Sequence, residues 1–541
     1  MKSNLLTGIF SRRPQTPHEL AKLLDLPEES ETRFLFCDSN KLVRIKTWFD
    51  ALPVTDYATT STHLYHALPE IAKVRLTTNV RAELLEHIRP LVLNCVASII
   101  DPLVKKPLTL NESEKKSVVI SQALLKHLAN GYARNAISAL TERKLSSQAA
   151  SLALHRALST LSLFLATNYR FYTPVPPHIW GMLNTLYRFS RSHGLNGKNV
   201  TDPLAADFSG NCDHSYLCSL ALACARPLQL RSSEIDLLYR KLGPWVKLLK
   251  LETYQANNQA LFAVLSSADA EPDYLDTFEA EQLAADGLVF DFQALLTNLE
   301  KKPETPLEEK NEIPRNLRQH LFQHWGSRVH RRNPRNPCNH ELEVCVGLAN
   351  IHSQLIKGIS FEDFVFGGAS NDSLVLGSNW KTNTQRSDGA PVNSATYTVV
   401  IKNSGARGFQ IQWQQVPPQL QAGELIAYRE AGKRHWQLAT IRWVRRSDSQ
   451  GVQSGAQALA HKMEAYGAST ITNNGKDSDY MRVLLLSEGG DESNLSIVMP
   501  NLVFSERHPV TLKKRGVVTK IQLTQRLLTT ASFCHFRYKS G

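Results

Sequence analysis

The stretch that decides the fold of the second half of the chain is TVVIKNSGARGFQIQW, from Thr398 to Trp413. The β-branched and aromatic residues at its two ends predict two strands. Between these strands, from Asn403 to Gly408, NSGARG supplies the small residues of a tight turn. Glycine has no side chain, so the backbone of such a turn can approach a ligand closely. The sequence therefore predicts a β-hairpin whose turn is able to hold a small molecule.

Further short strands are expected around this hairpin. Each is rich in β-branched or aromatic residues and is bounded by glycine, asparagine or aspartate, which is typical of a barrel or sandwich. The segments are HELEVCVGL (340–348), GELIAYRE (423–430), HWQLATIRWV (435–444), YMRVLLLS (480–487) and NLSIVMP (494–500). We expect one antiparallel β-barrel domain over 314–541. The polar stretch 357–395 is interpreted as an insertion in this domain, and 454–479 as a second loop.

The first half of the chain has helical periodicity. Apolar residues recur at intervals of three and four in NVRAELLEHIRPLVLNCVASIID (79–101) and SLALHRALSTLSLFLATNY (151–169). This pattern predicts an α-helical domain over 51–299, preceded by an N-terminal segment, 1–50, in which ETRFLFCDS (31–39) is a possible short strand. The charged, proline-bearing LEKKPETPLEEKNE (299–312) predicts a linker at 300–313. The expected fold class is α+β multidomain, with a mainly α-helical N-terminal region followed by a C-terminal β-barrel.

Positive charge gathers immediately after this linker. The chain of 541 residues has a formal net charge of +12, and residues 314–340 contain six arginines, four histidines and no acidic residue. In HRRNPR (330–335), prolines disfavour a helix, so Arg331, Arg332 and Arg335 are expected on a kinked loop. Arginine pairs bidentately with phosphate and with guanine edges. A basic turn can equally pair with acidic residues of the helical domain or remain solvated.

The order of arginine loop, strand, small-residue turn and tryptophan-bearing strand resembles a PilZ domain, the bacterial receptor module for cyclic di-GMP. The family signature is RxxxR followed by [D/N]xSxxG in a small β-barrel. Arg331 and Arg335 match the first element, and Asn403 and Gly408 match the ends of the second. Gly405 stands where the family has a serine, so the motif hydroxyl is absent from this chain.

The resemblance covers about 325–460 and implies that the fold there is a PilZ-like barrel. It implies that Arg331 and Arg335 clamp the dinucleotide, that the turn containing Asn403, Gly405 and Gly408 holds guanine edges, and that Arg328 and Arg332 are auxiliary ligand residues.

The resemblance also implies a function. The chain is expected to be a bacterial cyclic di-GMP effector, not an enzyme, with no metal and no cofactor. Ligand binding at the interdomain arginine loop would rearrange the helical domain, which acts on a protein partner in motility, pili or biofilm formation. The alternative is an RNA- or DNA-binding protein that uses the basic 314–340 segment.

Two other motifs are given structural interpretations. GGDES (489–493) is similar to the GGDEF hairpin of diguanylate cyclases, but the upstream metal-binding carboxylates are missing, so we interpret it as a solvated hairpin tip. Cys212, His214, Cys218 and Cys224 lack CxxC spacing and are interpreted as helix-core residues.

Cysteine usage and hydropathy indicate where the protein works. Eight cysteines without a disulfide framework predict reduced thiols in the cytoplasm. The N-terminus has the wrong pattern for a signal peptide. Because no stretch reaches roughly 18 uninterrupted apolar residues, we expect no membrane span.

Overall fold

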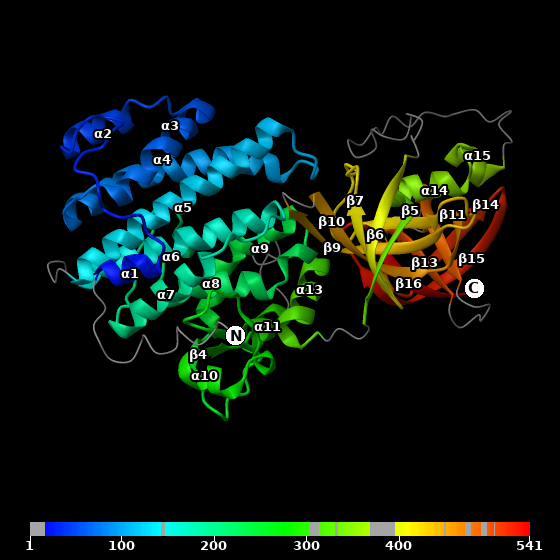
Figure 1. The fold of residues 1–541 in the computed structure, drawn as a ribbon. Helices are drawn as coiled ribbons and strands as arrows, with labels where there is room; N and C mark the ends of the chain where they lie inside the picture. Colours follow the sequence, from blue (N-terminus) through cyan, green and yellow to red (C-terminus); the bar gives the residue numbers. More distant parts are fainter. Residues whose placement is uncertain are drawn as a thin grey trace.

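The computed structural model of the chain describes residues 17–141, 147–301, 313–329, 334–367, 395–447, 451–470, 478–487, 495–501 and 504–540. A helical domain is followed by a small four-stranded sheet and then by two closed antiparallel β-barrels (Figure 1). The predicted fold class, a helical N-terminal region followed by a C-terminal antiparallel barrel, is confirmed.

The helical domain is built around the antiparallel pair α5 and α6, and α4 and α8 pack against this pair. Helix α6 is buried along almost its whole length because its apolar and small residues occupy all faces. Helices α4 and α6 have the length and apolar composition of a membrane span; 39% and 78% of their most apolar windows are buried within the protein. The helices are α1 (Pro17–Leu23), α2 (Leu42–Asp50), α3 (Tyr57–Lys73), α4 (Thr78–Val104), α5 (Glu112–Thr141), α6 (Ser147–Arg170), α7 (Ile179–Ser192), α8 (Cys212–Cys224) and α9 (Ser232–Trp245), with 3-10 turns η1 (Ala206–Phe208), η2 (Pro227–Gln229) and η3 (Val246–Leu248).

The strand expected at 31–39 does not form. Phe34 makes an isolated bridge with Ser39 of the same segment, and Glu31 makes another with Val74, so the backbone turns back on itself. The apolar residues that suggested a strand serve the helical core instead: Phe34 is fully buried, and the Phe36 ring lies 4.4 Å from that of Trp48 on α2.

A small sheet that the sequence did not predict follows the helices, within the range expected to be only helical. Its strand order is β1-β4-β2-β3, and 3-10 turn η4 and helices α10 and α11 accompany it. Its elements are β1 (Glu252–Thr253), β2 (Phe262–Leu265), β3 (Asp273–Tyr274), η4 (Leu275–Thr277), α10 (Ala280–Asp286), β4 (Gly287–Phe290) and α11 (Gln293–Glu300). The Phe292 ring stacks on Trp325 of α13 (Arg315–Gly326), with centroids 4.4 Å apart. The helix that precedes the arginine loop is therefore anchored on this sheet.

The range expected to form one barrel, 314–541, forms two, which corrects the prediction. The first has the strand order β10-β7-β6-β5-β8-β9 and the second β11-β12-β13-β16-β15-β14. The strands of the first are β5 (Asn336–Val346), β6 (Thr396–Gly405), β7 (Gly408–Trp413), β8 (Leu425–Glu430), β9 (Gln437–Ser447) and β10 (Gly451–Ala460). Those of the second are β11 (Lys462–Thr470), β12 (Met481–Ser487), β13 (Ser496–Pro500), β14 (Pro509–Lys514), β15 (Val517–Thr529) and β16 (Phe533–Ser540). All the strands predicted in this half are confirmed.

The loop expected at 454–479 is largely strand, because β10 and β11 occupy most of it and only His461 separates them. Serine, alanine and glycine are poor strand formers in isolation, but the interior of a six-stranded barrel has room for few large side chains. Ser454, for example, is fully buried and accepts a hydrogen bond of 2.8 Å from Trp413 Nε1.

Strands β5 and β6 are neighbours in the barrel although the connection between them is long. Helices α14 (Leu348–Leu355) and α15 (Phe361–Phe366) lie in this connection, and its remainder, 368–394, lies outside the described residues. The expected insertion at 357–395 falls within it. The expected linker at 300–313 lies outside the described residues except for its ends.

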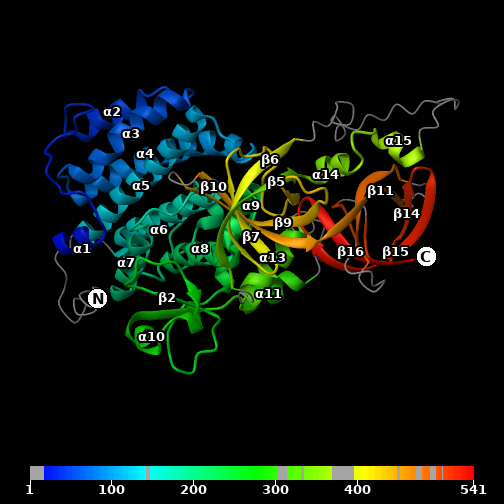
Figure 2. The ribbon, with the colours of Figure 1, turned by 45° about the vertical axis from the view of Figure 1, so that its right-hand side comes forward.

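The first barrel lies against the helical domain, and the second barrel lies beyond it. Figure 1 shows α9 and α13 between the helical bundle and the first barrel, and in the turned view of Figure 2 the second barrel again lies on the far side of the first. A backbone hydrogen bond of 2.8 Å from Arg446 on β9 to the carbonyl of Tyr172, just after α6, joins the two domains directly. Any ligand site at this end of the barrel therefore faces helical residues.

Candidate ligand-binding site

The pairing of β5 with β6 brings the end of the arginine loop to the glycine-bearing turn. Pro337 is in register with Asn403, and Asn336 with Ser404. Arg335 Nη1 consequently lies 3.5 Å from Asn403 Oδ1. The Asn403 side chain is oriented by a 2.5 Å hydrogen bond from its Nδ2 to Gln410 Oε1 on β7. Two elements far apart in the sequence thus meet at one end of the first barrel.

Gly405 and Gly408 are required by close backbone packing at this turn. A Cβ atom on Gly405 would lie 2.6 Å from the carbonyl oxygen of Pro334, and one on Gly408 would lie 2.6 Å from that of Ala456. Both distances are below the 3.0 Å that real Cβ atoms keep from such atoms. The space that a serine would fill at position 405 is occupied by the backbone of the arginine loop, which explains the departure from the family signature.

A cavity of about 500 Å³ opens beside this turn, in the size range of small-molecule sites. It lies between the first barrel and helix α13, with η2 of the helical domain at its edge. Its lining consists of Gln229, Gln323, His324, Val329, Pro334, Arg335, Gly405, Arg407, Gly408, Arg442, Trp443, Ala456 and Gln457. Three of these described residues are arginines and none is acidic, so the cavity favours an anion.

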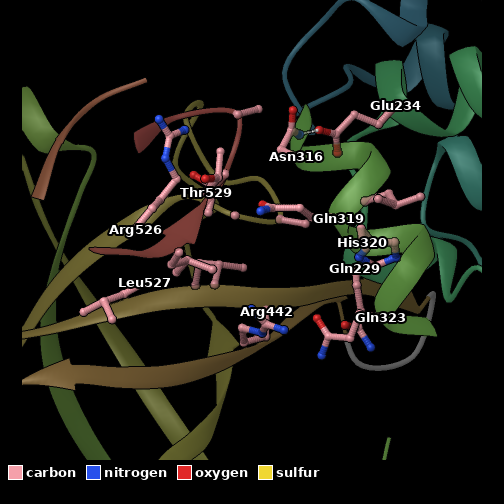
Figure 3. Close-up of a pocket in the computed structure, with 17 residues that line it drawn as sticks. Gln229, Glu234, Asn316, Gln319, His320, Gln323, Arg442, Arg526, Leu527 and Thr529 are labelled. Carbon is pink, nitrogen blue, oxygen red and sulfur yellow. Dashed lines mark hydrogen bonds between the residues drawn. The ribbon is translucent and has the colours of Figure 1, made fainter. Parts of the chain in front are cut away.

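A second cavity, of about 320 Å³, adjoins the first at the junction of the helical domain with both barrels. The two cavities share three lining residues, Gln229, Gln323 and Arg442. Figure 3 shows Arg442 near Gln323 and Gln229 at one end of this junction cavity, with Arg526 and Thr529 of β15 on the opposite side from α13. Arg442 therefore stands where the two cavities meet.

Burial controls the charge states on the α13 side of the site. Burial, followed by repulsion from the nearby His320 and Arg442, lowers the pKa of His324 to about 3. His324 is 2% exposed, so its imidazole is neutral at physiological pH. Burial also lowers the pKa of Arg442, which nevertheless stays charged because the guanidinium is so strongly basic.

The predicted site residues fall into three groups. Arg335, Asn403, Gly405 and Gly408 come together as described above. Arg328 forms an ion pair with Asp276 and lies 5.8 Å from the centre of the Tyr274 ring, so it is held by the small sheet. Arg331 and Arg332 lie outside the described residues, as does the GGDES segment.

Several lining residues were not predicted as site residues. Arg407 lies in the predicted turn, and Arg442 and Trp443 lie in a predicted strand. Arginine and tryptophan side chains close to the family motif were the sequence signal that could have identified them as ligand residues. Gln229 and His324 reach the cavity through the packing of helical elements on the barrel, which no local pattern reveals.

Among the residues that the structure describes, no three histidine, cysteine, aspartate or glutamate side chains are grouped to hold a metal ion. Cys212, Cys218 and Cys224 are buried in the core on α8. Burial raises the pKa of Cys212 and of Cys218 to about 12, so these thiols stay protonated.

Three family models match consecutive parts of the chain. They are the N-terminal domain of the cyclic-di-GMP receptor FimW over 43–257, its middle PilZ domain over 261–385 and 374–464, and the FimW C-terminal β-barrel domain over 466–540. The cyclic-di-GMP receptor FimW of Pseudomonas aeruginosa is 27% identical, covering 97% of this chain and 94% of that protein. No solved structure matches the chain. The second and third matches meet close to His461, where the two barrels join.

Proposed function

The chain belongs to the family of the cyclic-di-GMP receptor FimW, and we propose that it binds cyclic di-GMP in the cavity beside the turn from Asn403 to Gly408. The observation that carries this proposal is the approach of Arg335 to Asn403, 3.5 Å apart at an arginine-lined cavity. The ligand carries two phosphates and two guanines, for which arginine is the best suited side chain.

The residues of the cavity divide the recognition between them. Arg335 and Arg407 provide charge-assisted hydrogen bonds to phosphate oxygens or to guanine O6 and N7. Gly405 and Gly408 line the same cavity and allow the end of the arginine loop to pack closely against the turn. Trp443 offers an aromatic surface in the same cavity. Arg331 and Arg332 remain predicted ligand residues.

We propose a receptor and not an enzyme. Within the described part of the cavity lining, no side chain is a carboxylate, thiol or hydroxyl. The lining therefore lacks the metal-binding carboxylates that phosphoryl chemistry on a cyclic dinucleotide would use. Recognition without turnover is what this set of arginine, glutamine, histidine and backbone groups supports.

Ligand binding is proposed to reposition the helical domain through α13. This helix ends just before the arginine loop and contributes Gln323 and His324 to the cavity. Nearer the start of α13, Asn316 bonds to Glu234 of α9, and the His320 ring nitrogen lies 2.7 Å from the carbonyl of Ala225 after α8. A change in α13 would thus reach two helices of the helical domain.

The proposed output is regulation of pili, motility or biofilm formation through a protein partner of the helical domain. Cytoplasmic action is part of the same proposal, and the state of the cysteines supports it: all eight are free thiols.

Calorimetric titration of the full chain with cyclic di-GMP tests the proposal. Arg335→Ala and Asn403→Ala should weaken binding at least tenfold, because each removes a charge-assisted or amide contact. Lys402→Ala is a matched control, since this exposed neighbour on β6 bonds only to Asn339 in the described contacts. Absence of binding by the unmodified chain at several hundred micromolar ligand would overturn the proposal.

The nucleic-acid alternative has less support from the basic 314–340 segment. Leu317, Leu321, His324 and Trp325 of α13 are buried, and Arg328 is paired with Asp276. In the described part of this segment, several residues therefore serve the packing of the protein and not a continuous cationic surface for backbone binding. Steeply salt-dependent binding of single-stranded RNA or DNA would revive this alternative.

A further inference from the structure

Arg442 differs from other arginines buried between elements of this protein. Arg89 pairs with Asp202, Arg170 with Asp236, and Arg231 with Glu424. Arg442 makes no ion pair within the residues that the structure describes, and burial is the sole influence on its pKa. It is half-buried on β9 and lines both cavities.

Two histidines of α13 face Arg442, and both are neutral at physiological pH, so neither supplies a counter-charge. His320 and His324 lie close enough that each has its pKa lowered by the Arg442 charge, in addition to the larger effect of burial. Desolvating a guanidinium without a carboxylate partner costs several kcal/mol in general. Arg442 is half-buried, so it loses part of this hydration without gaining a carboxylate, which favours an anion in the adjoining cavity.

His324 provides a second, independent observation. It is 2% exposed and lines the same cavity as Arg335 and Arg442. Neither of its ring nitrogens has a hydrogen-bond partner among the described residues. A buried imidazole normally satisfies at least one nitrogen, so His324 has unused hydrogen-bonding capacity beside the cavity.

We propose that Arg442 of β9 and His324 of α13 complete the ligand site, Arg442 by binding a phosphate of the cyclic dinucleotide and His324 by hydrogen-bonding to a base edge. This inference rests on the proposed function. It assigns ligand contacts to β9 and α13, which lie outside the arginine loop and the turn that the sequence signature covers.

The geometry gives this half of the site a particular role. The ligand would be held between Arg335 and the turn on one side and Arg442 and α13 on the other. Because His324 belongs to α13, the ligand would draw that helix toward the barrel.

The experiment is calorimetric titration of the full chain with cyclic di-GMP for Arg442→Gln and Arg445→Gln. Arg445 lies on the same strand, is exposed and lines neither cavity, so the control makes the same change of charge. We expect Arg442→Gln to weaken binding at least tenfold and Arg445→Gln to change it less than twofold.

Thermal unfolding of the ligand-free variants separates a ligand contact from a structural one. Removing an uncompensated charge should leave the unfolding temperature of Arg442→Gln equal to or above that of the unmodified chain, whereas a structural arginine would lower it. His324→Phe, which fills the same space without unsatisfied nitrogens, should likewise keep its stability and lose affinity at least fivefold.

The outcomes distinguish the two proposals. If the unmodified chain binds and Arg442→Gln binds as well as Arg445→Gln, the role of Arg442 is refuted while the proposed function stands. If Arg442→Gln loses affinity only together with a lowered unfolding temperature, Arg442 is structural and the inference fails. If the unmodified chain does not bind, the proposed function fails first and this inference with it.

Discussion

Arg231, at the start of α9, donates from Nη2 to Oε2 of Glu424 in the first barrel across 3.4 Å. The same carboxylate oxygen accepts a 2.5 Å hydrogen bond from Ser532 Oγ of the second barrel. One carboxylate therefore joins the helical domain and both barrels. Glu424 is only 9% exposed, so water competes weakly for its carboxylate and these contacts are strong.

Replacing Arg231 with methionine should weaken this junction. The change leaves Glu424 buried without its cation, at an expected cost of about 2 kcal/mol in the apparent free energy of unfolding. Urea denaturation followed by tryptophan fluorescence measures it. Arg240→Met on the same helix is the control. The Arg240 side chain pairs with Asp236 but is itself exposed, so losing this ion pair should cost under about 0.5 kcal/mol. Equal losses in the two variants would contradict the assignment.

Introducing the family's serine at position 405 should reduce ligand affinity. Gly405→Ser adds the motif hydroxyl, but its Cβ would lie 2.6 Å from the Pro334 carbonyl oxygen, so the end of the arginine loop must move. We expect at least a fivefold loss of cyclic di-GMP affinity by calorimetry, and the same loss for Gly405→Ala. A gain in affinity for Gly405→Ser alone would show that the end of the arginine loop can move at little cost, and it would contradict this prediction.

Asp202 should be the most sensitive acidic residue of the helical domain. It is 1% exposed and binds both Arg89, at 2.6 and 2.9 Å, and Arg156, at 2.9 Å. Burial alone would raise its pKa, but the two arginines outweigh burial and hold the pKa below its usual value. Its stabilisation is therefore complete above about pH 4 and lost below it.

Asp202→Asn at pH 7 should destabilise the domain by roughly 3 to 5 kcal/mol, because it leaves the buried Arg89 guanidinium without its carboxylate and leaves Arg156 paired with Glu86 alone. Thermal unfolding measured by circular dichroism at 222 nm checks this. The control Asp207→Asn changes an exposed carboxylate nearby in the sequence. A loss below 1 kcal/mol for Asp202→Asn would refute the prediction.

Mild acid should destabilise the helical domain through His155. This residue is fully buried on α6, and burial, followed by repulsion from Arg156, lowers its pKa from 6.5 to about 4. The unfolded chain then binds the proton more readily, so stability is complete above pH 6.5 and falls as the pH drops toward 4.

Between pH 7 and pH 5, titration of His155 should lower the free energy of unfolding of the unmodified chain by about 2 kcal/mol. His155→Leu should not show this part of the loss. Unfolding curves at the two pH values give this difference, and His435→Leu, on the exposed connection between β8 and β9, is the control. Equal pH dependence in both variants would exclude His155 as a contributor.

The parts of the fold that the sequence could predict are those whose signal is local. Alternation and turn residues identified β5 to β9, and the motif at Asn403 and Gly408 predicted half of the proposed site, because each is encoded within a few adjacent residues. β1 and β3 have two residues each and show no periodicity. The second barrel was missed because His461 alone separates it from the first, and no turn signal marks the change.

The other half of the site could not be predicted because it depends on tertiary packing. His324 and Gln229 become lining residues only when α13 and η2 dock on the barrel. Arg442 was visible as an arginine on a predicted strand, but its lack of a partner is a property of the assembled domains. Arg328, by contrast, was expected near the ligand and is paired with Asp276, the outcome foreseen for an ordinary basic turn.

The single residue between β10 and β11 has a mechanical consequence. A connection of one residue does not allow the two barrels to rotate independently. Together they comprise about 200 residues and should tumble as one rigid body in NMR relaxation or fluorescence anisotropy measurements. A rotation of the first barrel at its contact with α13 would then move the far end of the second barrel as well. Ligand binding to the first barrel would therefore change the position of the second barrel too.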